Sequence, residues 1–164
     1  MHRKICFLFC LLLIPFLFVC CSERRDFLAC LDGDYVCLVR GEIGGEPFSA
    51  TLYASGRAVY ASPERLCGII AKEDGKTLTL GDMSLPAEAL VGLFLPARLL
   101  CDEYEVSGSG TEKDGACYVD GTNEHGSRRV YVAKDGSPCR VVGQWQGVNA
   151  DFEITNFEIE STQK

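Results

Sequence analysis

Glycine-containing turn pairs divide this chain into short segments, and their spacing constrains the fold more than any other feature. Asp-Gly occurs at residues 32–33, 74–75, 114–115, 120–121 and 135–136, and Gly-Gly occurs at 44–45. Such pairs supply the positive φ that tight turns between antiparallel strands need. The segments between them alternate apolar and polar residues, as half-buried strands do. The pattern predicts a mainly β (α+β) domain built on a curved antiparallel meander sheet or half-barrel.

One hairpin can be aligned residue by residue around the Gly44-Gly45 turn. The expected partners are Ile43–Glu46, Gly41–Phe48, Val39–Ala50, Cys37–Leu52 and Tyr35–Ala54. All of them share one face of the hairpin because side chains alternate with period two, and that face is almost wholly apolar. A shift of one residue would mix the two faces, so the sequence specifies this register.

A second hairpin is predicted around Asp135-Gly136, with Val130 opposite Val141, Val132 opposite Cys139 and Tyr131 opposite Arg140. Further strands are expected at 57–61, 67–72, 76–80, 115–119 and 148–159. In the last strand a bulge near residues 155–156 would turn both Phe157 and Ile159 inward. The Ser-Gly-Ser-Gly stretch at 107–110 is expected to form a flexible turn.

Residues 85–100, LPAEALVGLFLPARLL, predict the one helix, placed on the concave side of the sheet. Pro86 suits the first helical turn, and Pro96 should end or kink the helix near Leu95. The segment has almost no polar face, which is typical of a helix buried on more than one side. It either fills the core of the curved sheet or lines a cavity for an apolar ligand.

The N-terminus resembles an export signal. Arg3 and Lys4 precede an apolar run at 5–19, and two cysteines follow. The run is shorter than the roughly 20 residues that span a bilayer as a helix, and it is typical of a signal peptide. A bacterial lipoprotein signal fits best, with Cys20 as the small residue and Cys21 as the lipidated one. Lipidation of Cys20 and an uncleaved signal anchor are the alternatives.

Cleavage before Cys21 would divide the chain into a signal peptide (1–20), a tether (21–33) and one domain (34–164) outside the cytoplasm, anchored to the cell membrane. The mature chain would have 144 residues and a formal charge of −9, from 14 basic and 23 acidic side chains. This size suits one domain with a hydrophobic core. Its negative charge argues against a nucleic-acid partner, because phosphate binding needs clustered cations.

A family resemblance follows from the order of several segments: GEIGGEPFSATL, ASPERLCGIIAKEDGKTLTL, AEALVGLFLPARLL, RRVYVAKDGSPCRVVG and ADFEITNFE. Their layout resembles small lipoproteins of clostridial-type bacteria, which are similar to the LolA, LolB and LppX group. The resemblance covers most of residues 34–160. It implies an antiparallel half-barrel whose helices fill a concavity that holds an acyl chain or lipid in the best-known members. It implies no catalytic residue.

The sequence offers no catalytic, metal or cofactor motif. His125 is the only histidine of the mature chain and lies in a polar loop, and neither His-x-x-x-His nor Cys-x-x-Cys occurs. We therefore expect a non-enzymatic protein without a metal or cofactor.

Two functions of different class remain. The first is a binding module for a lipid or other apolar ligand, with the binding residues Phe48, Leu52, Leu90, Leu93, Phe94 and Trp145. The second is a structural or protein-interaction lipoprotein of the cell envelope with a filled core and an unknown protein partner. A co-purifying lipid would distinguish the first from the second.

Six further cysteines follow Cys21, at positions 30, 37, 67, 101, 117 and 139. An exported domain with six cysteines often contains disulfides. Cys117 and Cys139 are nevertheless predicted to be unbonded to each other, because one strand should separate their two strands. Cys37 is predicted to be a small core hydrophobe.

Overall fold

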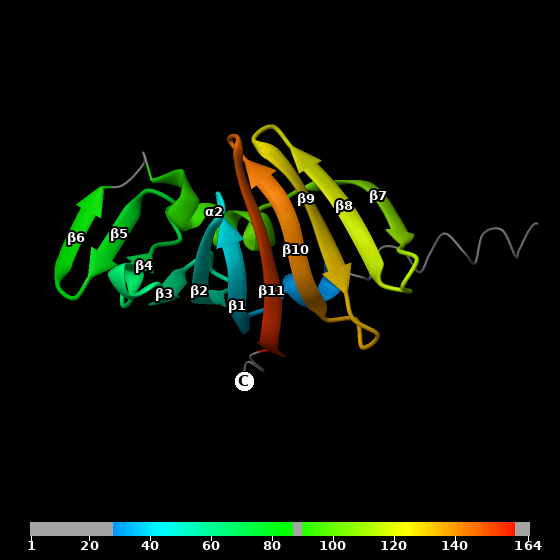
Figure 1. The fold of residues 1–164 in the computed structure, drawn as a ribbon, viewed down its shortest axis with the longest axis horizontal. Coiled ribbons are helices and arrows are strands. Elements are labelled where there is room, and N and C mark those ends of the chain that lie inside the picture. Colours follow the sequence, from blue (N-terminus) through cyan, green and yellow to red (C-terminus); the bar gives the residue numbers. More distant parts are fainter. Residues whose placement is uncertain (1–27, 87–89, 160–164) are drawn as a thin grey trace, which may run out of the picture.

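The structure is a computed structural model that describes residues 28–86 and 90–159. In this part of the chain an 11-stranded antiparallel sheet has the order β6-β5-β4-β3-β2-β1-β11-β10-β9-β8-β7 (Figure 1). The strands are β1 (Tyr35–Ile43), β2 (Glu46–Tyr53), β3 (Ala58–Ser62), β4 (Ile70–Ala71), β5 (Thr77–Leu80), β6 (Met83–Pro86), β7 (Glu105–Thr111), β8 (Cys117–Asn123), β9 (Gly126–Val132), β10 (Pro138–Trp145) and β11 (Val148–Ile159). One α-helix, α2 (Val91–Cys101), and two 3-10 turns, one at residues 28–31 and η2 (Glu64–Leu66), complete the described elements. The predicted mainly β fold is confirmed.

The β1–β2 hairpin has the predicted register. Cys37 pairs with Leu52, Val39 with Ala50 and Gly41 with Phe48. Gly44 and Gly45 have φ values of 60° and 84°, the positive values that a two-residue turn requires at both positions. The apolar face is buried as expected, and Cys37 is 1% exposed. The alternation of residues was therefore sufficient to place this hairpin.

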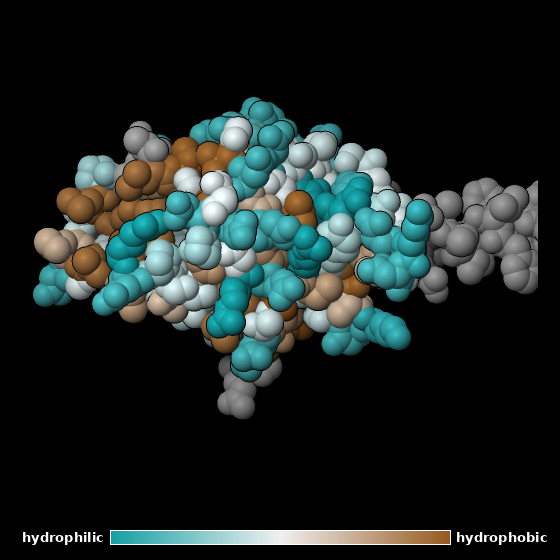
Figure 2. Space-filling model, viewed as in Figure 1, coloured by the Kyte–Doolittle hydropathy of each residue, from teal (hydrophilic) through white to brown (hydrophobic). Residues whose placement is uncertain are grey.

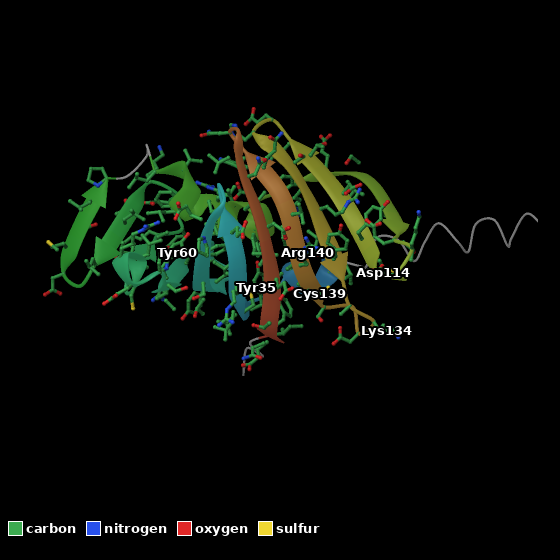
Figure 3. The ribbon with its side chains drawn as sticks, in the orientation of Figure 1. Tyr35, Tyr60, Asp114, Lys134, Cys139 and Arg140 are labelled. Carbon is green, nitrogen blue, oxygen red and sulfur yellow. The ribbon has the colours of Figure 1, made fainter. Side chains whose placement is uncertain are left out.

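The β9–β10 hairpin follows the prediction except at its start. Val130 pairs with Val141 and Tyr131 with Arg140, whose guanidinium lies 5.6 Å over the tyrosine ring. The predicted partner of Val132 is wrong: Val132 pairs with Pro138, and the register shifts between Pro138 and Arg140. Cys139 is the extra residue of this irregular step at the beginning of β10, and Arg140 directly follows it. Both residues are labelled in Figure 3. The extra residue lets Pro138 reach the core beside Val132.

The bulge predicted in β11 is present. The register between β1 and β11 shifts between Val36 and Leu38, and Asn156 has φ 50°. Beyond the bulge Phe157 stacks on the buried Tyr35 with 5.1 Å between ring centroids, as the inward prediction requires. Ile159 pairs with Tyr35 but lies at the rim of that face, where it is 61% exposed.

The predicted helix at 85–100 is wrong at its start, whereas its end agrees to within one residue. Residues 83–86 form β6, in which Leu85 pairs with Leu78 and Met83 with Leu80, and the helix spans Val91–Cys101. Pro86 ends this edge strand, where a missing N–H costs no sheet hydrogen bond. Pro96 lies inside α2, so it does not end the helix near Leu95 as the sequence suggested. The residues on both sides of Pro96 are buried, so tertiary packing compensates for the helix hydrogen bond that proline cannot make.

The Ser-Gly-Ser-Gly stretch is a strand and not the predicted flexible turn. It belongs to β7, which pairs with β8. A Cβ at Gly110 would lie 2.7 Å from the hydroxyl oxygen of Tyr118. Gly110 therefore allows the Tyr118 ring to cross the neighbouring strand, a packing role for glycine within a strand.

Helix α2 fills the concave side of the sheet and lies behind it in Figure 1. It packs mainly against β10, β11, β2 and β3. Leu95 and Leu99 are fully buried, and Leu100 and Phe94 are nearly so. The helix therefore supplies the middle of the hydrophobic core, as the first of the two alternatives expected. Among the described residues no helix is long and apolar enough to cross a membrane.

Candidate functional site

A groove runs beside α2. We call it the α2 groove; its volume is about 340 Å³, and its walls come from the β4–β5 turn, α2, the β8–β9 turn and the end of β10. The lining residues are Gly75, Lys76, Val91, Phe94, Arg98, Asp102, His125, Trp145 and Gln146. The groove's volume lies within the range of some 300–1,000 Å³ that is typical of small-molecule sites, but its walls carry more polar than apolar surface, whereas such sites mostly have apolar walls.

The floor of the groove is aromatic. Phe94 is 4% and Trp145 7% exposed, so both rings are packed into the protein with one edge toward the groove. The imidazole of His125 lies 4.8 Å from the Trp145 ring, and Tyr104 meets it edge-on at 6.5 Å. The backbone N–H of Gln146 donates to the His125 carbonyl at 2.9 Å, which joins the two turns that hold the indole.

Arg98 carries the positive charge of the groove wall. Its Nη1 donates to the two Asp102 carboxylate oxygens at 3.2 and 3.4 Å, one helical turn further on. Its guanidinium carbon lies 5.9 Å from the centre of the Trp145 ring. On the other side it lies against Gly75, where a Cβ would collide with Nη2. A glycine with φ 66° thus makes room for this side chain.

Arg128 fixes the C-terminal end of α2. It is 9% exposed, and its Nη1 donates to the Leu99 and Leu100 carbonyl oxygens at 2.6 and 3.0 Å. These are among the carbonyls that a helix end leaves without an internal partner. The guanidinium also lies 4.2 Å over the Tyr104 ring. Burial lowers the pKa of Arg128 and raises that of Tyr104 to about 12, so the Tyr104 hydroxyl stays neutral at physiological pH.

An uncovered apolar strip continues the concave face beyond the groove. Leu80, Met83 and Leu85 are 47–62% exposed and share the face of the buried Leu78, because Leu78 pairs with Leu85 and Leu80 with Met83. Leu90, at the start of α2, is 51% exposed. We call these four exposed residues the β5–β6 strip. Figure 2 shows hydrophobic surface gathered over this end of the molecule.

The structure brings only some of the predicted binding residues together. Phe94 and Trp145 line the α2 groove, and Leu90 lies in the strip. Leu93 is half-buried, and its carbonyl accepts a 2.9 Å hydrogen bond from Tyr60.

Two predicted binding residues lie deeper. Phe48 packs against Phe152 and Tyr60 at about 6 Å between ring centroids, and Leu52 is fully buried. A direct contact of either residue with a ligand stays a prediction. Cys21 lies outside the described residues.

Sequence reasoning missed the polar residues of the groove. His125 was interpreted as a loop histidine, and Gly75 only as a turn residue. Arg98 had a usable signal, because it is the only charged residue in the sequence of α2, VGLFLPARLLC. A single cation in an otherwise apolar helix must reach solvent, a counter-ion or a ligand.

A larger hollow of about 600 Å³ lies on the opposite face of the sheet, across β8–β11. Its lining surface is more apolar than polar, and both of its arginines are engaged. Arg128 donates to the Leu99 and Leu100 carbonyl oxygens, and Arg129 donates to Asp120 at 2.7 and 3.0 Å and to Glu112 at 3.0 Å. Asp151, also in its lining, is paired with Arg140. Among the described residues, the lining of the α2 groove contains the aromatic rings of Phe94 and Trp145, and the lining of the hollow contains no aromatic ring. In the described part of the chain, no three or more His, Cys, Asp or Glu residues are grouped as metal ligands would be.

Comparison with known proteins gives a likeness of architecture only. No protein-family model matches the chain, and no curated protein matches its sequence. Among solved structures it is similar to Mycobacterium tuberculosis lipoprotein LppX, at 13% identity over 86% of this chain and 95% of LppX, with a TM-score of 0.42. It is also similar to MucB, at 10% identity over 87% of this chain and 61% of MucB, with a TM-score of 0.44. A third similar structure is LprF from Mycobacterium bovis, at 13% identity over 84% of this chain and 92% of LprF, with a TM-score of 0.37. The resemblance to the LppX group inferred from the sequence is thus also found in the structure; at such TM-scores it says nothing about a ligand.

Proposed function

We propose that the protein is a membrane-anchored binding module that holds a lipid or other apolar small molecule in the α2 groove, outside the cytoplasm. The observation that carries the proposal is the open groove with Phe94 and Trp145 on its floor, continued by the β5–β6 strip. Monomeric proteins seldom expose such contiguous apolar surface without a binding role. Transfer of an apolar ligand onto this surface would remove about 25 cal/mol of unfavourable hydration per Å² buried.

Trp145 provides the test because it is the only tryptophan of the chain. Titration with the neutral dye N-phenyl-1-naphthylamine should give energy transfer from Trp145, since a bound dye would lie against the indole. Val91→Glu, which places a charge in the groove wall, should weaken dye binding about tenfold or more. Leu38→Glu is the matched control, because Leu38 is 42% exposed and lies outside the groove. Equal dye binding by the wild type and Val91→Glu would rule out this groove as the site.

A second function, that of a structural or protein-interaction lipoprotein, is favoured by the filled core. Helix α2 occupies the concave side with Leu95, Leu99 and Leu100 buried, which leaves the groove and the strip as surface features. Native mass spectrometry of protein purified from its own membrane distinguishes the two. A co-purifying lipid supports the binding module, and a ligand-free protein bound to a second polypeptide supports the alternative.

The anchor is proposed from the N-terminal sequence alone: a basic start, a short apolar run and Cys21. Diacylglycerol on Cys21 would supply two acyl chains, and two chains retain a protein at a membrane where one holds it only marginally. Cys21→Ala should release the protein or leave an unprocessed precursor, visible by fractionation and mass. Processing and retention like those of the wild type would show that the anchor lies elsewhere, and Cys20→Ala would then identify the alternative.

A further inference from the structure

We propose that the hollow across β8–β11 is a second binding site, and that it takes a linear, neutral glycan. The inference is independent of the α2 groove, so it does not rest on the proposed function. The volume of the hollow is about 600 Å³, within the range of some 300–1,000 Å³ that is typical of small-molecule sites. It lies on the face of the sheet that α2 leaves uncovered, so a chain-like ligand can cross several strands there (Figure 1).

A row of four neutral polar side chains crosses the hollow. Its members are cross-strand neighbours on β8, β9, β10 and β11, in the order Thr122, Ser127, Gln144 and Asn149. Trp145, which follows Gln144 in β10, is 7% exposed and packs in the core. Because side chains alternate along a strand, the row points away from the core. Neighbouring strands lie about 4.8 Å apart, so the row is about 14 Å long.

The side chains of this row are free to bind a ligand. None of the four forms a hydrogen bond with another described residue. The amides of Gln144 and Asn149 offer N–H donors and a carbonyl acceptor, and the hydroxyls of Thr122 and Ser127 both donate and accept. Sugar hydroxyls also donate and accept, whereas a carboxylate or phosphate only accepts. A series of hydroxyl groups therefore uses more of these groups than an anion would.

Most charges in the lining already have partners, which argues against a charged ligand. Arg129 forms an ion pair with Asp120 at 2.7 Å, and Asp151 forms one with Arg140 at 2.6 Å. Arg128 donates to two carbonyl oxygens at the end of α2. Either arginine of the lining would have to give up these contacts to bind an anion.

Glu42 and Val142 complete the match to a neutral sugar. Glu42 is exposed and is the one charged residue of the lining that has no ion-pair partner in the described part of the chain. Its carboxylate can accept from a hydroxyl and repels an anion. Val142 lies between Arg129 and Asp151 in the neighbouring row. It is half-buried and gives the C–H face of a sugar ring an apolar contact.

The test uses three neutral trisaccharides, chitotriose, cellotriose and maltotriose, and one anionic trisaccharide, trigalacturonate. The full chain is purified in a detergent without a sugar head group and titrated by ¹⁵N NMR. We expect at least one neutral trisaccharide to shift the side-chain NH₂ signals of Gln144 and Asn149 saturably. It should bind about tenfold or more tighter than trigalacturonate, because the anion meets Glu42 and paired arginines. The trisaccharide that binds most tightly identifies the linkage.

The double variant Gln144→Ala/Asn149→Ala should weaken this binding about tenfold or more, the loss of two hydrogen bonds. Backbone signals of β10 and β11 report its affinity. Thr51→Ala/Thr155→Ala is the matched control, because both threonines lie beside Leu38 on the same face and outside the hollow. Circular dichroism checks that both variants fold.

The remaining outcomes would overturn the inference. These are no saturable shift with any neutral trisaccharide, equal affinity for trigalacturonate, or unchanged affinity in Gln144→Ala/Asn149→Ala. Displacement of N-phenyl-1-naphthylamine by the trisaccharide would place the sugar in the α2 groove and would also overturn it. Failure of the inference leaves the proposed function intact, because dye binding in the groove is measured separately.

Discussion

The guanidinium of Arg98 lies against the backbone of Gly75, at a point where any side chain would collide with it. The two residues come from α2 and the β4–β5 turn, so this contact joins the helix to a remote part of the sheet. Gly75 has φ 66°, a conformation that glycine adopts readily. The shape of the groove therefore depends on the absence of one methyl group.

Gly75→Ala should destabilise the protein more than the backbone conformation alone explains. A left-handed conformation costs a non-glycine residue about 1–2 kcal/mol, and the added methyl must also displace Arg98. Gly81→Ala is the matched control, because Gly81 has φ 58° and open space around its Cβ position. Urea unfolding should show a larger loss for Gly75→Ala than for Gly81→Ala. Equal losses would mean that Arg98 moves aside at no cost.

Phe94→Ala should destabilise the fold by about 3–5 kcal/mol, the usual cost of truncating a buried phenylalanine. The side chain is 4% exposed and belongs to the main hydrophobic core. Leu90→Ala, four residues earlier and 51% exposed, should cost less than about 0.5 kcal/mol. Urea unfolding of both variants measures the difference. A small loss for Phe94→Ala would show that α2 contributes little to the core.

The two hairpins and the helix show how far the sequence predicts this fold. Gly44-Gly45 and the alternation around it determined the β1–β2 register, because one face of each strand had to be apolar. Residues 83–86 gave no such signal, since between MSLP and the apolar sequence of α2 the only charged residue is Glu88 and there is no turn pair. The expectation that the helix ends at Pro96 was wrong because it used local propensity alone. Proline is unfavourable inside a helix, but here the packing of the core around Pro96 holds the helix together.

The groove was less predictable than the fold. Phe94 and Trp145 could be proposed because large apolar residues near a helix are candidates for a concave face. Gly75, Arg98 and His125 come from three elements that are distant in the sequence. Their meeting depends on how α2 crosses the sheet, and alternation within strands carries no information on that crossing.

Arg128→Met should destabilise the protein although it replaces a charge by an apolar side chain of similar length. Without Arg128 the buried carbonyl groups of Leu99 and Leu100 lose their donor, and an unsatisfied buried acceptor costs about 1–3 kcal/mol. Arg65→Met removes only a surface ion pair with Glu46, usually worth less than about 1 kcal/mol. Thermal or urea unfolding compares the two. If Arg128→Met were as stable as wild type, desolvation of the charge would offset its hydrogen bonds.

The Arg140–Asp151 pair should make stability depend on pH in the acid range. Arg140 donates to both carboxylate oxygens, at 2.8 and 2.6 Å, and these hydrogen bonds lower the pKa of Asp151. A carboxyl whose pKa is lower in the folded state stabilises the fold fully above its unfolded pKa of about 3.9. This contribution is lost as the pH falls from that value through the folded pKa.

The urea midpoints of wild type and Asp151→Asn, measured from pH 7 to pH 2, test this dependence. Asp151→Asn should lose less stability over the acid range than wild type. Asp34→Asn is the control, since Asp34 has no ion-pair partner among the described residues, and it should follow the wild type. The effect should be small because both side chains of the pair are 47% exposed. Parallel curves for Asp151→Asn and wild type would mean that the pair adds no stability.

The strand order β8-β9-β10 supports the prediction that Cys117 and Cys139 are not bonded to each other. Cys117 pairs with Val132 of β9, and Val132 pairs on its other side with Pro138, next to Cys139. Two strand spacings separate the cysteines by about 9.5 Å, and a disulfide needs Cα atoms within about 7 Å. All six cysteines of the described chain are free.

Alkylation of freshly isolated protein followed by non-reducing peptide mapping should therefore yield no Cys117–Cys139 peptide. Cys67 is exposed and should be alkylated first. Cys37 should be alkylated last, because it is 1% exposed and burial raises its pKa to about 12, which leaves almost no thiolate near neutral pH. These two thiols serve as internal controls for access. A Cys117–Cys139 cross-link would require β9 to leave its place between β8 and β10, and would overturn the order of the last strands.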